Sequence, residues 1–173
     1  MSDSVLSFLL GIIQGLTEFL PISSSAHLLL PSLLFGLNDL GLSFDIAVHA
    51  GTLTAVIYYF RNELLLMSKS FFIYDEYLLP HRKLALSLII ATIPVVFAGL
   101  FIKDLIEQRI FSIEHIAIAN IIFAGILLFA YLNKKDKNNL YSITFYSALF
   151  IGIFQTLALF PGASRSGTAI TAA

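Results

Sequence analysis

Long apolar stretches alternate with short polar ones along this chain. Residues 84–102 contain no charged side chain, and as an α-helix they would extend about 28 Å, close to the roughly 30 Å of a bilayer's hydrocarbon core. Three further stretches are of comparable length and contain few charges: 44–60, 113–132 and 141–160. The pattern predicts an all-α, polytopic membrane protein in which these four stretches are candidate spans.

The first apolar stretch, residues 4–37, is interrupted. Pro21 and three serines at 23–25 divide it into two arms of roughly 15 residues, each short for a complete crossing. Irregular backbone at membrane depth is tolerated where it lines a cavity in the protein. We therefore expect residues 4–37 to form a re-entrant helical hairpin, which enters and leaves on the same side.

Composition supports a membrane location and excludes several function classes. Hydrophobic residues make up 58% of the chain and charged residues 12%, about half of the usual share of roughly 25%. A net charge of −1 provides no basic stripe for a nucleic-acid backbone, so no nucleic-acid partner is expected. The absence of cysteine excludes a disulfide framework and a cysteine nucleophile.

The distribution of Lys and Arg predicts the orientation of the chain. Basic residues are concentrated in loops 61–83 and 133–140, whereas loop 103–112 is balanced by acidic residues and loop 38–43 has no Lys or Arg. The positive-inside rule therefore places loops 61–83 and 133–140 in the cytoplasm.

An internal repeat relates residues 11–25 to residues 152–166 at an offset of 141. Seven of the fifteen positions are identical. The identities that an apolar bias does not explain are Gly11 with Gly152, Gln14 with Gln155, Ser23 with Ser164 and Ser25 with Ser166. These matches indicate a duplication, so a second re-entrant hairpin is expected around the second copy.

Three predicted spans separate the two copies, and an odd number of crossings makes the repeats inverted. Broken helices from inverted repeats commonly meet near the midplane of a membrane protein. We assign residues 1–140 to the first repeat and residues 141–173 to the start of an incomplete second one. We also expect that the sequence is truncated after the second copy, and that these 173 residues alone would be unstable or inactive.

Few ionisable residues lie inside the apolar stretches, and such residues are functional candidates by default. They are Glu18, Asp45 and Arg165, with His27 and His49 as titratable companions. Two helix N-termini directed at one point would bind an anion, and an arginine suits bidentate phosphate binding. The set therefore predicts phosphoryl chemistry.

The residues leave their individual roles open. Glu18 could hold a divalent cation or act as a base, and Ser24 could be a nucleophile activated by His27 or only a phosphate ligand. Arg165 would neutralise charge on the transferred phosphoryl group. The alternatives are helix-capping serines, a hydrogen-bonded core His27, and an i,i+4 ion pair between Asp45 and His49.

Two motifs resemble those of a known family. QGLTEFLPISSSAHL and PGASRSG closely resemble the signatures of the bacterial undecaprenyl-diphosphatase family, also known as bacitracin resistance proteins. Residues 44–60 are similar to the family's third span. The resemblance implies hydrolysis of undecaprenyl diphosphate to undecaprenyl phosphate and phosphate, which recycles the cell-wall lipid carrier and confers bacitracin resistance. It also implies a multi-pass protein of the bacterial inner membrane with a periplasmic-facing active site.

The resemblance also implies a role for each matching residue. The catalytic residues would be Glu18, Ser24, His27 and Arg165. The phosphate ligands would be Ser23, Ser25, Ser164, Ser166 and Thr168. A divalent cation, Mg²⁺ or Ca²⁺, would be held by Glu18 with Gln14. One departure is that the family usually reads SRSGAT, whereas this chain reads SRSGTA, with Thr168 one place early and Ala169 where the hydroxyl is expected.

The main rival hypothesis is a flippase or transporter for a polyprenyl phosphate, since inverted re-entrant repeats are typical of transporters. A membrane scaffold is disfavoured by the buried Glu18 and Arg165. The expected partners are a polyprenyl diphosphate lipid and membrane lipid, and a homo-oligomer is left open.

Overall fold

A computed structural model describes residues 2–107, 112–134 and 143–173, apart from the side chains of 105–107. Within these residues the secondary structure is helical and contains no strand, so the all-α prediction is confirmed. The α-helices are α1 (Asp3–Thr17), α2 (Ser24–Phe35), α3 (Gly41–Tyr59), α4 (Arg61–Lys69), α5 (Leu79–Glu107), α6 (Ile113–Asn133), α7 (Phe145–Gln155) and α8 (Arg165–Ala172). Two 3₁₀-helices, η1 (Glu76–Leu78) and η3 (Thr156–Leu159), complete the set.

Three helices are long and apolar enough to cross a membrane: α3, α5 and α6. They contain the predicted spans 44–60, 84–102 and 113–132 almost entirely. Helix α5 is longer than predicted at both ends and begins at Leu79. Pro80 is compatible with this early start, because a proline in the first helical turn leaves no hydrogen bond unmade.

The prediction that residues 141–160 form a span was wrong. Helix α7 has 11 residues and continues as η3, and together they are shorter than a span. The helical segment ends with η3 at Leu159, because Phe160 is extended, at φ −80° and ψ 129°, as expected for a residue that precedes a proline. The predicted cytoplasmic loop 133–140 lies largely outside the described residues.

The loop expected at residues 61–83 is in part helical. It contains α4 and η1, and its last five residues begin α5. Glu63 in the first turn and Lys69 in the last turn of α4 complement the helix dipole. The charged residues of this segment predicted a loop, but an acidic residue in the first turn and a basic residue in the last turn also stabilise a short helix.

Two helix–break–helix units follow the internal repeat. Helices α1 and α2 pack against each other across the break at residues 18–23, and α7 packs against α8 across the second break. Helix α2 begins at Ser24 and α8 at Arg165, which are 165 − 24 = 141 positions apart. The helix starts therefore keep the sequence offset, while the inversion of the two units across a membrane stays a prediction.

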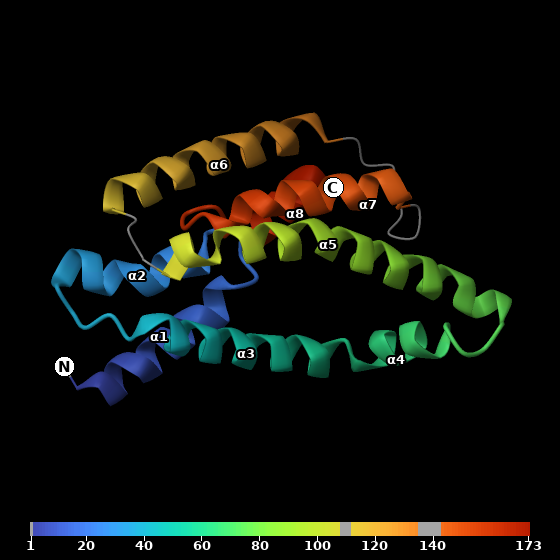
Figure 1. Cartoon of the computed structure of the whole chain (residues 1–173), viewed down its shortest axis with the longest axis horizontal. Coiled ribbons are helices and arrows are strands. Elements are labelled where there is room, and N and C mark those ends of the chain that lie inside the picture. Colours follow the sequence, from blue (N-terminus) through green and yellow to red (C-terminus); the bar gives the residue numbers. More distant parts are fainter. Residues whose placement is uncertain (1, 108–111, 135–142) are drawn as a thin grey trace.

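The second unit lies between α5 and α6, where α7 packs on α5 and α8 packs on α6 (Figure 1). Two glycines permit this close approach. A Cβ on Gly152 would overlap the carbonyl oxygen of Ala91 in α5. Gly162 has a φ of +103°, and a Cβ there would lie 2.7 Å from the carbonyl oxygen of Ile116 in α6. The first unit packs instead against α3.

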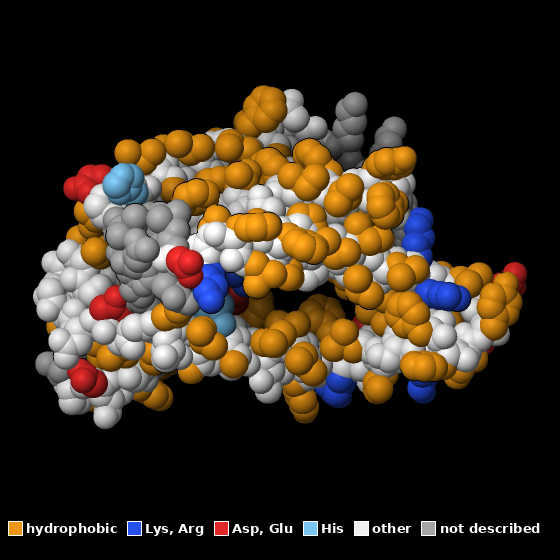
Figure 2. All heavy atoms as spheres, in the orientation of Figure 1, with side chains coloured by type: hydrophobic (Ala, Val, Ile, Leu, Met, Phe, Trp, Pro, Cys, Tyr) orange, Lys and Arg blue, Asp and Glu red, His pale blue; other side chains and the backbone are white. Residues whose placement is uncertain are grey.

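Most large hydrophobic side chains are exposed on the outside of the molecule. Figure 2 shows them covering much of one face, with charged side chains near its margins and in one small group inward of its left end. Ile121 and Phe129 of α6 are about 70% exposed, at 73% and 69%. An apolar exterior of this kind is suited to lipid and would be unstable in water.

Candidate active site

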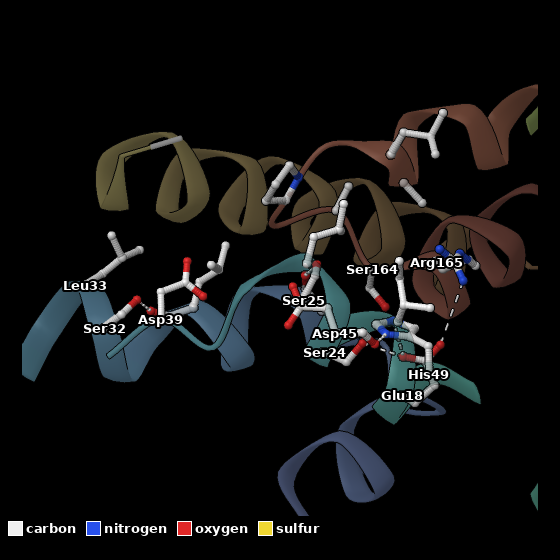
Figure 3. A pocket seen from close by; sticks show the side chains of 18 residues that line it. Glu18, Ser24, Ser25, Ser32, Leu33, Asp39, Asp45, His49, Ser164 and Arg165 are labelled. Carbon is white, nitrogen blue, oxygen red and sulfur yellow. Dashed lines mark hydrogen bonds and ion pairs between the residues drawn. The ribbon is translucent and has the colours of Figure 1, made fainter. Parts of the chain in front are cut away.

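The two breaks meet at one pocket. A cavity of about 440 Å³ is lined by both breaks and by neighbouring parts of α2 and α3. Its polar lining comprises Glu18, Ser23, Ser24, Ser25, Ser32, Asp39, Asp45, His49, Ser164 and Arg165. Figure 3 shows Glu18, Ser24, His49 and Arg165 gathered at one end, and Asp39 with Ser32 at the other.

The backbone of the first break is shaped to present side chains to this pocket. Helix α1 ends at Thr17, and the Glu18 N–H still donates to the Gln14 carbonyl, so Glu18 keeps a helical direction. Ser23 is buried with a φ of 61°, a left-handed conformation that costs a non-glycine residue about 1–3 kcal/mol. Helix α2 then begins at Ser24, with its N-terminus beside the pocket. A strained residue of this kind is typical of a functional site.

Glu18 is the centre of the polar cluster. Its Oε2 atom accepts hydrogen bonds from Gln14 Nε2 at 2.8 Å and from Ser24 Oγ at 2.5 Å. His49 Nε2 lies 3.5 Å from the same oxygen, and an Arg165 guanidinium nitrogen lies 3.9 Å from Oε1. The Glu18 side chain is only 16% exposed. Two donors on Oε2 and the guanidinium beside Oε1 therefore converge on this one carboxylate.

His49 is the site residue that the sequence analysis did not place. It was interpreted there as a partner of Asp45 in an ion pair. In the structure its Nδ1–H donates to the Asp45 backbone carbonyl at 2.7 Å, and its Nε2 faces Glu18. The apolar surroundings of His49 made it a candidate, but no sequence feature connects α3 to the first break.

His27 is not brought to the hydroxyl of Ser24. Its Nδ1–H donates to the backbone carbonyl of Ser23 at 2.8 Å, and its side chain is not among those lining the pocket. Ser24 Oγ instead donates to Glu18. The i,i+3 spacing of Ser24 and His27 puts both residues on one helix face. The His27 ring nevertheless forms its hydrogen bond with the Ser23 backbone carbonyl at the start of α2. The structure thus offers Glu18, not His27, as the base for Ser24.

The serines predicted as phosphate ligands divide into two groups. Ser23 and Ser25 line the pocket with their hydroxyl oxygens 3.3 Å apart. Ser164 and Ser166 both donate to the Leu20 backbone carbonyl, at 3.3 and 2.8 Å, and so join the second break to the first. Ser164 also lines the pocket, whereas Ser166 does not.

Thr168 does not lie at the pocket. Its Oγ1–H donates to the Arg165 carbonyl at 2.9 Å, and the side chain is almost fully buried. The hydroxyl therefore stabilises the first turn of α8, which carries Arg165. Arg165 itself is 58% exposed and projects from the N-terminus of α8 into the pocket.

The first break offers oxygen donors for a hard cation. Gln14 is fully buried, and because Nε2 donates to Glu18, its Oε1 points elsewhere and has no hydrogen-bond partner among the described residues. In the described part of the chain, no group of three or more His, Cys, Asp or Glu could hold a metal. One carboxylate with neutral oxygens nevertheless fits Mg²⁺, which usually shares its ligands with substrate phosphates.

The fold and the pocket define a class of protein. This is a helical membrane protein in which two broken helices enclose a carboxylate, a hydroxyl, an imidazole and a guanidinium. The chain belongs to the family described as bacitracin resistance protein BacA, whose sequence model matches residues 7–173. The family resemblance seen in the two motifs is confirmed.

Curated relatives are similar along nearly all of the chain. An undecaprenyl-diphosphatase of Aliivibrio salmonicida (strain LFI1238) is 48% identical over 169 residues, which cover 96% of this chain and 63% of the relative. An undecaprenyl-diphosphatase of Saccharophagus degradans (strain 2-40 / ATCC 43961 / DSM 17024) is 45% identical over 172 residues, covering 99% of this chain and 65% of the relative. The chain spans just under two thirds of the length of these relatives.

Proposed function

We propose that this protein hydrolyses undecaprenyl diphosphate to undecaprenyl phosphate and inorganic phosphate. Two relatives with this activity in their names support the substrate class. The observation that carries the chemistry is the hydrogen bond from Ser24 Oγ to Glu18 Oε2, because it pairs a hydroxyl nucleophile with a carboxylate base in a partly enclosed pocket.

Arg165 and the helix N-termini would bind the diphosphate. The guanidinium projects into the pocket from α8, and α2 begins beside the same pocket at Ser24. The unpaired N–H groups of a helix N-terminus attract phosphate, and a guanidinium forms paired hydrogen bonds with its oxygens. These groups would hold the terminal phosphorus near Ser24 and stabilise the negative charge of the transition state.

The transfer itself would proceed in two steps. Glu18 takes the proton of Ser24, Oγ bonds to the terminal phosphorus, and the P–O anhydride bond breaks, so that undecaprenyl phosphate leaves with the electron pair. Glu18 then loses this proton to solvent. Water attacks the phosphoserine and gives a proton to Glu18, the P–Oγ bond breaks to release inorganic phosphate, and Glu18 returns the proton to Oγ, which restores Ser24.

A divalent cation, Mg²⁺ or Ca²⁺, is part of this proposal. Glu18 would hold it, and Gln14, whose Nε2 donates to Glu18, would turn its amide to present the unpartnered Oε1 to the same ion. When bound, the cation would neutralise negative charge on the phosphate oxygens.

We further propose that the protein lies in the bacterial inner membrane, with the pocket opening toward the periplasm. The basic residues of 61–83 support a cytoplasmic position for that segment. The pocket is lined by α3 residues between Leu42 and His49, in the N-terminal half of the helix. Figure 1 shows α4, which begins the basic segment, following the other end of α3.

Phosphate release from undecaprenyl diphosphate by the full-length protein, purified in detergent, tests the proposal. Hydrolysis needs no sealed bilayer, whereas transport does, so detergent separates the phosphatase from a flippase. We expect turnover in detergent that Glu18→Gln abolishes and Ser68→Ala, an exposed hydroxyl change on α4, leaves unchanged. Movement of lipid phosphate across vesicles without phosphate release in detergent would refute the proposal in favour of a flippase.

A further inference from the structure

The Glu18 carboxylate is contacted by Arg165 of α8 and by residues of three other helices, of which α3 is one. Gln14 reaches the carboxylate from α1, Ser24 reaches it from the start of α2, and His49 approaches it from α3. The first two residues are close to Glu18 in the chain, so their contacts are local. His49 provides the contact that links the carboxylate to a separate membrane-crossing helix.

One nitrogen of the His49 ring is held by a hydrogen bond, and the other nitrogen points toward Glu18. Its Nδ1–H is bonded to the Asp45 carbonyl of the same helix, which restricts rotation of the ring. Its Nε2 is thereby directed toward Glu18 Oε2, 3.5 Å away, and the two form an ion pair when both ring nitrogens carry a proton. The side chain is 31% exposed, so the ring also shields this side of the carboxylate from the surroundings.

His49 and Arg165 approach opposite oxygens of the carboxylate. His49 faces Oε2, the oxygen that accepts the Ser24 hydroxyl, whereas Arg165 faces Oε1. Arg165 is the more exposed and carries a fixed charge, so it attracts Glu18 away from Ser24. A contact on the Oε2 side opposes that attraction and keeps the base aligned with its hydroxyl.

We propose that His49 is a positioning residue for the hydrolysis, acting through Glu18 to keep Oε2 in hydrogen-bonding contact with Ser24. The inference rests on the proposed function and adds a residue from α3 to the site. His49 need not touch the substrate, so its loss should lower the rate of the chemical step and leave substrate binding intact.

Steady-state kinetics of His49→Leu and His49→Gln in detergent test the assignment. Leucine fills similar space without a donor, while glutamine restores an N–H that reaches toward the carboxylate. We expect His49→Leu to lower kcat by about tenfold to hundredfold, as misplacement of a catalytic group does, with KM within about twofold of wild type. His49→Gln should recover most of the lost kcat. Thr54→Ala on the exposed face of α3, where Oγ1 bonds only a carbonyl of its own helix, serves as the matched control.

A second readout does not depend on activity. Thermal unfolding of His49→Leu, Glu18→Gln and the double variant forms a cycle that measures whether the two side chains interact. We expect the two shifts in melting temperature to be non-additive. Additive shifts, a wild-type kcat in His49→Leu, equal losses in the Leu and Gln variants, or a change confined to KM would each overturn the assignment. Absence of phosphate release by the full-length wild-type protein would refute the proposed function instead, whereas the unfolding cycle would still show whether His49 and Glu18 interact.

Discussion

The two glycines at matching positions of the internal repeat should respond oppositely to alanine. Gly11 and Gly152 lie 141 positions apart in the same motif, in α1 and α7. A Cβ at Gly11 would meet nothing within 4 Å, whereas a Cβ at Gly152 would overlap the carbonyl oxygen of Ala91. The same substitution therefore adds a methyl group to open space in one copy and to a closed helix contact in the other.

The two effects can be estimated from helix propensity and packing. Alanine is favoured over glycine in a helix interior by about 1 kcal/mol, so Gly11→Ala should stabilise the protein by about that amount. Overpacking typically costs about 1–3 kcal/mol, and the contact at Gly152 is with backbone, which cannot rotate away. After the propensity gain is subtracted, Gly152→Ala should destabilise by up to about 2 kcal/mol.

Thermal unfolding followed by circular dichroism in detergent measures both changes. For a chain of this length, 1 kcal/mol shifts the melting temperature by about 2–4 °C. We expect a rise of about 2–4 °C for Gly11→Ala and a fall of up to about 8 °C for Gly152→Ala. Shifts of the same sign in the two variants would refute the close packing of α7 on α5 and with it this account of the second unit.

Four further outcomes are expected in the phosphate-release assay. Ser24→Ala should abolish turnover with little change in affinity, and wild-type protein quenched during turnover should contain phosphoserine; oxygen-isotope labelling that shows direct attack by water would contradict this. Arg165→Lys should lower turnover by about two orders of magnitude, because lysine cannot form paired contacts; a near wild-type rate would remove Arg165 from the mechanism. His27→Ala should reduce the rate far less than Glu18→Gln, since His27 bonds a backbone carbonyl, and equal losses would argue for His27 as the base. Chelation of divalent cations should stop turnover and Mg²⁺ or Ca²⁺ should restore it, whereas full activity in excess chelator would exclude the cation.

The sequence alone determined the features that depend on neighbouring residues. Apolar stretches of sufficient length with few charges predicted α3, α5 and α6, because in lipid the backbone must satisfy its hydrogen bonds within a helix. Pro21 with the serines located the first break, and the repeat placed a second break in the second copy, with α2 and α8 starting at the same offset of 141. These properties are local or periodic, so they can be read along the chain.

Span length was the point at which the local pattern failed. Residues 141–160 are uncharged, yet α7 ends at Gln155 and continues as a 3₁₀-helix before Pro161. Hydropathy measures the apolar character of a segment and does not indicate where an α-helix changes to a 3₁₀-helix. Likewise, the charges of 61–69 indicated a loop and the segment forms α4.

Only the tertiary structure decided which polar groups become partners. Sequence spacing paired Ser24 with His27 and Asp45 with His49, but the folded chain joins Ser24 and His49 through Glu18. Ser166, predicted to bind phosphate, donates to the carbonyl of Leu20, 146 positions earlier. A hydrogen bond forms over about 3 Å between atoms that packing brings together, and the packing of separate helices sets such distances independently of their separation in the sequence.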